Sequence, residues 1–144
     1  MQKKIVHIDF HTGLGKSGTY ALLVDAEAGS ADHIRLHEAF GDRVQPWSAD
    51  HGVAYKIRGG LPAAVSGLFG TDADVITCEF GTIAGLKVLK ALRSENQSHQ
   101  WGGTIDADKQ RLLSAFRPPS TSWENDILRG GATVIIQAIN QLRT

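Results

Sequence analysis

Apolar and polar residues alternate at the start of the chain, from residue 5 to residue 11. Because successive side chains of a β-strand point to opposite faces, one face of this predicted strand carries Val6, Ile8 and Phe10. The opposite face carries the residues at positions 7, 9 and 11, which are two histidines on either side of an aspartate. A second strand with similar chemistry is predicted over residues 75–80 (VITCEF).

The segment after the first strand contains three glycines, so residues 12–18 are predicted to form a loop. Residues 20–24 (YALLV) predict a short strand or a helical turn. Residues 42–60 are rich in glycine, proline and polar residues and are predicted to be irregular.

Five segments have helical patterns. Residues 30–40 begin with Ser30 as an N-cap and end at Gly41. Residues 61–69 form a predicted short helix with proline in its first turn. Residues 83–95 place Leu86, Leu89 and Leu92, with Val88 beside them, in the apolar positions of an amphipathic helix; two further helices are expected over residues 106–116 and over most of 123–142.

Strands interleaved with helices predict an α/β fold for residues 1–144 as one domain. Three helices follow residue 83, whereas two clear strands precede them, which is few strands for a free-standing sheet. An exposed sheet edge favours association, so we expect a homo-oligomer or a partner chain that covers this edge.

Charge and cysteine content narrow the classes of function. Lys plus Arg and Asp plus Glu each number 15, and this balance gives no electrostatic argument for nucleic acid or an anionic membrane as a partner. The single cysteine, Cys78, excludes a disulfide framework within the chain. With no apolar run of about 18 residues, the sequence predicts a soluble, cytoplasmic protein.

The segment GLGKSG at residues 13–18 has the look of a phosphate-binding loop. The motif G-x-x-x-x-G-K-[ST] would need its first glycine at position 10, which is Phe10. No clear helix follows Lys16 to bind a phosphate at its amino end. A nucleotide-binding site at Lys16 is therefore the weaker of two hypotheses.

The second hypothesis is a metal and carboxylate site. His11 and Glu79 each stand at the carboxyl end of a predicted strand, where ligands bind in open α/β sheets. A neutral imidazole binds zinc well, and a carboxylate next to zinc can accept a proton from the attacking water. Spacing alone also allows ordinary polar contacts for both residues.

Two segments, IDFHTGLGKSG at 8–18 and VITCEFGT at 75–82, resemble the zinc carboxypeptidase superfamily. They are most similar to its bacterial branch known as domain of unknown function 2817, which carries D-x-H-T-G-L-G and, later, E-[FW]-G-T. The similarity extends through LKALRSEN at 89–96 and covers nearly the whole chain. The resemblance implies a partial zinc-carboxypeptidase-like fold, with a mixed sheet flanked by helices.

The resemblance also implies roles for particular residues in the hydrolysis of a peptide or related amide bond. His11 corresponds to the third zinc ligand and Glu79 to the catalytic general base and acid. Tyr55 lies where carboxypeptidase-like enzymes place a mobile, substrate-contacting tyrosine, although a loop aromatic is an equal alternative. Arg58 is a candidate for binding a substrate carboxylate, with simple solvation as the alternative. Asp9 either orients a ligand or bonds to neighbouring backbone.

The family's first two zinc ligands come from an H-x-x-E segment, and no histidine of this chain is followed by glutamate three residues later. The chain thus resembles the C-terminal half of the catalytic domain, which a complementing N-terminal half would complete. We expect weak zinc binding and little or no activity from this chain alone, because catalytic zinc normally has three protein ligands. The alternative is a non-catalytic remnant that self-associates or binds a partner. The pair His33 and His37, four apart on a predicted helix, is expected to face solvent.

Overall fold

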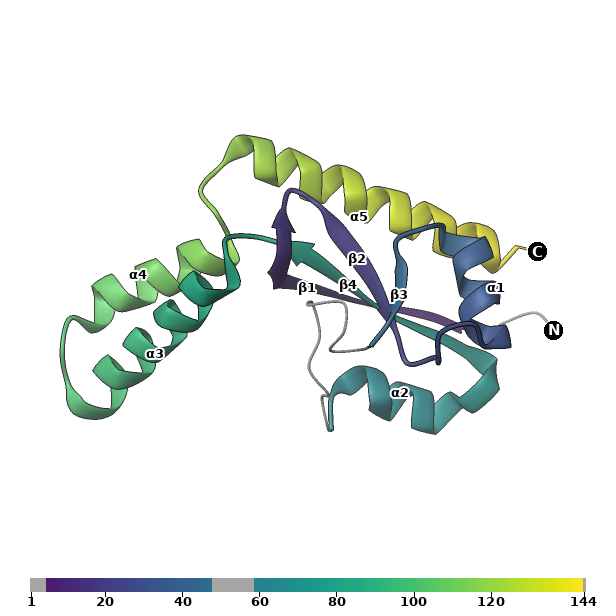
Figure 1. The fold of residues 1–144 in the computed structure, drawn as a ribbon, viewed down its shortest axis with the longest axis horizontal. Coiled ribbons are helices and arrows are strands. Elements are labelled where there is room, and N and C mark those ends of the chain that lie inside the picture. The colour runs from purple at the N-terminus through teal and green to yellow at the C-terminus, as the bar shows by residue number, and fades with distance from the viewer. Residues whose placement is uncertain (1–4, 48–58, 144) are drawn as a thin grey trace.

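The computed structural model describes residues 5–47 and 59–143, which form a four-stranded mixed sheet with five helices (Figure 1). The strands are β1 (Ile5–Ser17), β2 (Tyr20–Val24), β3 (Val44–Pro46) and β4 (Ala73–Gly81). The helices are α1 (Ala31–Phe40), α2 (Leu61–Phe69), α3 (Gly85–Trp101), α4 (Ile105–Phe116) and α5 (Thr121–Gln141), with a 3₁₀ turn at Gly70–Asp72. The predicted α/β class is confirmed. None of the helices in this part of the chain is long and apolar enough to span a membrane.

The strands lie in the order β1-β4-β2-β3. β1 runs parallel to β4, with Ile5 opposite Ala73 and Thr12 opposite Phe80. β2 is antiparallel to β4 and parallel to β3. This order puts β1 at an edge of the sheet and brings the carboxyl ends of β1 and β4 side by side.

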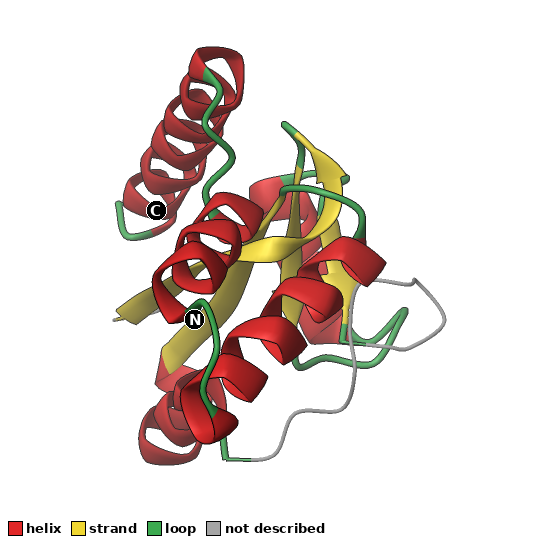
Figure 2. Ribbon diagram, turned by 90° about the vertical axis from the view of Figure 1, so that its left-hand side faces the viewer, coloured by secondary structure: helices red, strands yellow, loops and turns green. Residues whose placement is uncertain are grey.

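The main core lies between the sheet and the helices α1 and α5. Its buried residues are apolar and come from the sheet and both helices: Leu22, Val24, Val44, Ile76, Cys78 and Phe80 of the sheet, Leu36 and Phe40 of α1, and Val134 and Ala138 of α5. Since strand side chains alternate, the residues next to Ile76, Cys78 and Phe80 along β4 face the other side of the sheet, as do their pairing partners on β1. α2 lies on that other side (Figures 1 and 2).

The predicted ends of α1 are confirmed. The Ser30 side chain accepts a hydrogen bond from the His33 backbone N–H at 3.2 Å and so caps the helix. Gly41 ends the helix with a positive φ of 82°, a conformation that glycine adopts without steric cost. α2 also has the predicted bounds and begins with Pro62 in its first turn.

α3 and α4 form a hairpin that projects from the sheet (Figure 1). Asp108 of α4 joins the two helices, because it accepts hydrogen bonds from the hydroxyls of Ser94, at 2.8 Å, and of Ser98 on α3. Arg111 pairs with the same carboxylate. A polar cluster therefore holds together a hairpin that has little sheet to pack on.

The hairpin corrects the predicted apolar face of α3. Val88 and Ala91 are its buried residues, whereas the leucine row Leu86, Leu89 and Leu92 is exposed. The helix also extends six residues beyond the predicted end, since its polar last turns pack on α4 rather than on a core. An amphipathic pattern marks an apolar face, but it does not show that the same chain covers this face.

Two predictions about irregular segments are wrong. Residues 12–17 continue β1 instead of forming a loop, because Ser17 pairs with Gly81 at the end of β4 after a shift in register. The positive φ angles of Gly13 (142°) and Gly15 (100°) allow the strand to bend there. Within the predicted irregular region, residues 44–46 form β3 beside β2.

Candidate functional site

The candidate site forms where β1 and β4 end. His11 and Glu79 are direct partners in the parallel register of the two strands. Both face away from α5, and the Nδ1 atom of His11 lies 3.9 Å from Oε2 of Glu79. The expected meeting of these two side chains at neighbouring strand ends is therefore present.

Asp9 holds the other side of the imidazole. Asp9 precedes His11 by two residues on the same strand face, and its Oδ2 atom lies 3.0 Å from Nε2 of His11. The His11 side chain is half exposed, while that of Asp9 is mostly covered. A ring nitrogen bonded to a carboxylate leaves the opposite nitrogen available as an acceptor or ligand, and here this is Nδ1, the atom that faces Glu79.

Glu79 is a buried acid, with 5% of its surface exposed. The backbone N–H of Leu14 donates a hydrogen bond of 2.9 Å to its Oε1 atom. Burial raises the pKa of Glu79 above the ordinary value, and this effect outweighs the opposing influences of the Leu14 bond and of His11. The site thus contains a carboxyl group that holds its proton more tightly than a carboxyl group in water.

The two sequence motifs, residues 8–18 and 75–82, contact each other around this carboxyl group. Besides the Leu14 bond, the Thr82 hydroxyl donates to the carbonyl oxygen of Gly13 at 3.3 Å. β1 then passes so close to the end of β4 that a Cβ on Gly81 would lie 2.0 Å from the carbonyl oxygen of Lys16. Glycine is therefore the residue that fits at position 81.

Residues at the end of α4 and the start of α5 pack against the backbone where β1 and β4 meet. The indole Nε1–H of Trp123, at the start of α5, donates a buried hydrogen bond of 2.8 Å to the Gly81 carbonyl. The ring of Phe116, at the end of α4, would lie 2.9 Å from a Cβ on Gly13. These contacts fix the backbone that carries Leu14 and therefore the position of the acid.

His11, held by Asp9, could supply one ligand of a zinc centre, but the described residues do not supply the others. An imidazole whose outer nitrogen is held by a carboxylate is the usual form of a zinc-bound histidine. However, in residues 5–47 and 59–143 no three His, Cys, Asp or Glu side chains are arranged to hold a metal ion. Three protein ligands are the norm for catalytic zinc, so these residues alone do not fit the ion.

The remaining predicted residues either lie outside the described part of the chain or lie elsewhere in the fold. Tyr55 and Arg58 lie outside the described residues. Lys16 lies in β1 and is followed by β2, so no helix begins there to bind a phosphate. His33 and His37 lie on α1 with their rings 6.3 Å apart, and His37 contacts the exposed Asp42.

Sequence reasoning missed the residues that position the acid, namely Leu14, Thr82 and Trp123. Leu14 acts through its backbone N–H, which leaves no trace in the identity of the side chain. The alternation of β4 could have drawn attention to Thr77, which shares the face of Glu79. Thr77 is 1% exposed, and its hydroxyl has no hydrogen-bond partner in the part of the chain that the structure describes.

Comparison with known proteins gives one match. A family model described as "Protein of unknown function (DUF2817)" matches residues 1–130. Neither the curated proteins nor the solved structures give a match to the chain. The matched range includes β1, β4 and every residue of the candidate site described above.

Proposed function

We propose, from the premise that this chain belongs to the DUF2817 family of proteins, that it carries part of a hydrolytic site for peptide or related amide bonds. The site would be of the zinc-carboxypeptidase kind, of which the chain corresponds to the C-terminal half. One observation carries the proposal: Glu79, a buried acid with a raised pKa, faces the Nδ1 atom of a histidine that Asp9 holds from its other side.

In this proposal Glu79 moves the protons. Its raised pKa brings the carboxyl group closer to neutral pH, where a general base that later acts as an acid is most effective. The Leu14 N–H fixes Oε1, which leaves Oε2 to accept a proton from water and return it to the leaving amine. Tyr55 and Arg58 remain proposed substrate contacts.

His11 would be a metal ligand through Nδ1, with Asp9 fixing the orientation of the ring. Zinc, when bound, supplies Lewis acidity toward an amide carbonyl. The missing ligands would come from a complementing N-terminal polypeptide, so this chain alone is expected to bind zinc weakly and to hydrolyse little. The competing function is a non-catalytic domain that self-associates or binds a partner.

Zinc titration of a variant that lacks the helical histidine pair tests the metal role. Because His33 and His37 could bind zinc without any relation to the site, the H33A/H37A chain is the background for calorimetry. We expect weak binding in this background and its loss on adding His11→Ala. Binding that is unchanged by His11→Ala would contradict a metal role for His11.

The catalytic role is tested by activity in the presence of candidate N-terminal halves that carry H-x-x-E. Release of C-terminal amino acids from acylated dipeptides should require both polypeptides and should be lost on chelation. Glu79→Gln keeps an acceptor for the Leu14 N–H and removes the titrating group, so it should reduce kcat by at least about 100-fold. If Glu79→Gln hydrolyses normally, Glu79 is not the acid-base group. If both polypeptides bind zinc together and yet hydrolyse nothing, the non-catalytic function is favoured.

A further inference from the structure

The outer edge of β1 and one side of α5 form a continuous surface that the described residues leave uncovered. β1 pairs with β4 along one edge, and no described strand pairs with its other edge. The exposed backbone N–H and C=O groups of such an edge can accept another strand. β1 is also the longest strand in the described part of the chain, so the edge is extensive.

α5 carries two apolar faces. Val134 and Ala138 are buried against the sheet. A second stripe consists of Leu128, Ile135 and Ile139, which are 71%, 45% and 42% exposed and recur at helical spacing. We refer to these three residues as the α5 stripe.

The α5 stripe runs along the β1 side of the helix. Gly131, between Leu128 and Ile135 in sequence, lies beside Phe10 of β1, since a Cβ on it would be 3.8 Å from Phe10 Cε1. Phe10 is itself 45% exposed. The uncovered strand edge and the uncovered helix stripe are therefore parts of one surface.

We propose that this surface binds a second copy of the same chain, through antiparallel pairing of the two β1 edges about a two-fold axis at Ile8. The two sheets become one eight-stranded sheet, and the two α5 stripes meet on the same face of it. Helices pack at about 8–10 Å, which requires α5 to lie close to the edge strand. The position of Gly131 beside Phe10 places it there.

Side-chain complementarity and the avoidance of like charges favour this register. With the axis at Ile8, His7 lies opposite the Asp9 of the second copy on one face. On the other face, Val6 lies opposite the second copy's Phe10, an aromatic and β-branched pair of the kind that stabilises sheets. An axis at Asp9 would place two aspartates opposite each other, which is destabilising.

An axis at Phe10 would also avoid like charges, but it would give a shorter ladder. The regular pairing of β1 ends at Thr12, where its register shifts. Centred on Ile8, the ladder extends from Ile5 to His11, whereas centred on Phe10 it runs only from Ile8 to Thr12. The α5 stripe contains no charged residue, so its two copies can meet without repulsion.

The first test measures the dimer dissociation constant by sedimentation equilibrium. Ile135→Glu puts a charge in the centre of the α5 stripe and should weaken the dimer at least tenfold. Ile136→Glu is the matched control, because Ile136 is 59% exposed on the same helix and points about 100° away from Ile135. It should leave the dissociation constant unchanged, as should Leu86→Glu on the projecting hairpin.

The second test reads the register by disulfide cross-linking. The native Cys78 is buried, and burial raises its pKa to about 12, so an introduced cysteine reports without interference. Ile8→Cys should form a disulfide dimer under oxidising conditions, because residues on the axis have Cα atoms about 4.5–5.5 Å apart. Val6→Cys should not, since its two copies are separated by about 13 Å along the strands.

The proposal is overturned if the wild-type chain stays monomeric at about 100 µM, a concentration on the order of the dissociation constant of a weak homodimer. It is also overturned by a dimer that Ile135→Glu and Ile136→Glu weaken equally, or by a link through Phe10→Cys in place of Ile8→Cys. If a complementing polypeptide binds the monomer and Ile135→Glu abolishes that binding, the surface belongs to that polypeptide, and the second-copy proposal is likewise rejected.

Discussion

At the scale of single residues, the site combines one buried acid with a backbone that holds it. Glu79 lies among polar groups from two strands, and the Leu14 N–H fixes one of its oxygens. Residue types and their positions at the carboxyl ends of two predicted strands were sufficient to predict the meeting of His11 and Glu79. The Leu14 contact depends on the bend of β1 at its glycines, which a local reading of the sequence could not predict.

The raised pKa of Glu79 has a consequence for stability. The folded state holds this proton more tightly than the unfolded chain, so the contribution of Glu79 is fully present below the ordinary carboxyl value of 4.5 and is lost as the pH rises through the raised pKa. Urea unfolding at several pH values should therefore show the wild type losing stability relative to Glu79→Gln as the pH rises through this window. Parallel pH profiles for the two proteins would show that the carboxyl group is not perturbed.

The close approach at Gly81 gives a second prediction at this scale. Gly81→Ala would place a methyl group against the Lys16 carbonyl, which is backbone and cannot turn aside, so the free energy of unfolding should fall by more than about 3 kcal/mol. Gly67→Ala is the control: its Cβ meets nothing within 4 Å, and a helical Gly→Ala change should stabilise α2 by about 0.5–1 kcal/mol. Similar stability losses in both variants would contradict the steric explanation.

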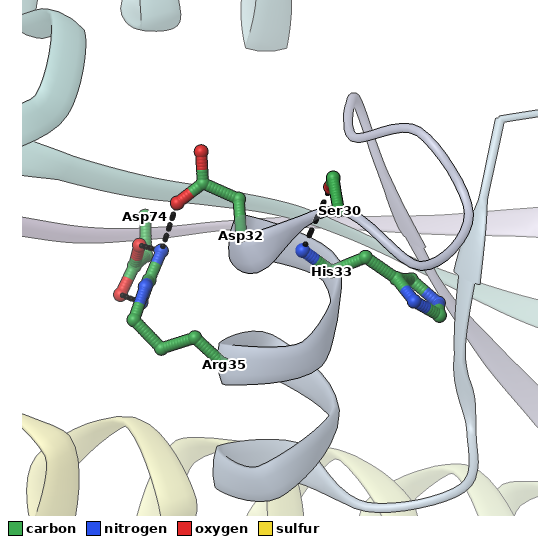
Figure 3. A network of polar contacts seen from close by, with 5 residues as sticks. All are labelled: Ser30, Asp32, His33, Arg35 and Asp74. Carbon is green, nitrogen blue, oxygen red and sulfur yellow. Dashed lines mark hydrogen bonds and ion pairs between the residues drawn. The ribbon is translucent and has the colours of Figure 1, made fainter.

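At the scale of elements, one partly buried ion pair fixes α1 to the start of β4. Arg35 donates two hydrogen bonds to Asp74, of 2.9 and 2.7 Å, and a further one to the exposed Asp32 (Figure 3). Asp74 is 2% exposed, so it is desolvated on folding and depends on charged partners. This bidentate contact sets where α1 sits along the sheet.

Arg35→Ala should therefore lower the free energy of unfolding by about 2–4 kcal/mol, because it removes the guanidinium partner of a buried carboxylate. Asp32→Ala removes the exposed contact of the same arginine and should cost less than about 1 kcal/mol. Chemical denaturation of the two variants under the same conditions measures both effects. Equal losses would mean that the Asp74 contact is no stronger than the surface one.

The element predictions succeeded where local signals were sufficient and failed where distant pairing decided the structure. The cap at Ser30 and the end at Gly41 are local, and both are confirmed. The glycine-rich residues 12–17 are a strand because the end of β4 provides hydrogen-bonding partners from another part of the chain. The predicted apolar row of α3 is exposed because no described element packs on it.

At the scale of the whole molecule, the chain divides into a sheet with a buried core and a projecting hairpin. The core holds Leu22, Ile76 and Val134, each 0% exposed, whereas α3 bears a row of exposed leucines. Hydrogen bonds from Ser98 and Ser94 lower the pKa of Asp108, so its carboxylate stays charged and joins the two hairpin helices. Stability should therefore be unevenly distributed, since regions with few buried apolar contacts open first.

Native-state hydrogen exchange tests this division. Backbone amides of α3 and α4 should open with a lower free energy than those of β4, and Asp108→Ala should speed hairpin exchange roughly tenfold or more while leaving β4 unchanged. Ser114→Ala is the matched control on α4, because its hydroxyl bonds only locally, to the Gln110 carbonyl. If the hairpin and β4 instead opened with one common free energy in all three proteins, the hairpin would be part of a single cooperative unit.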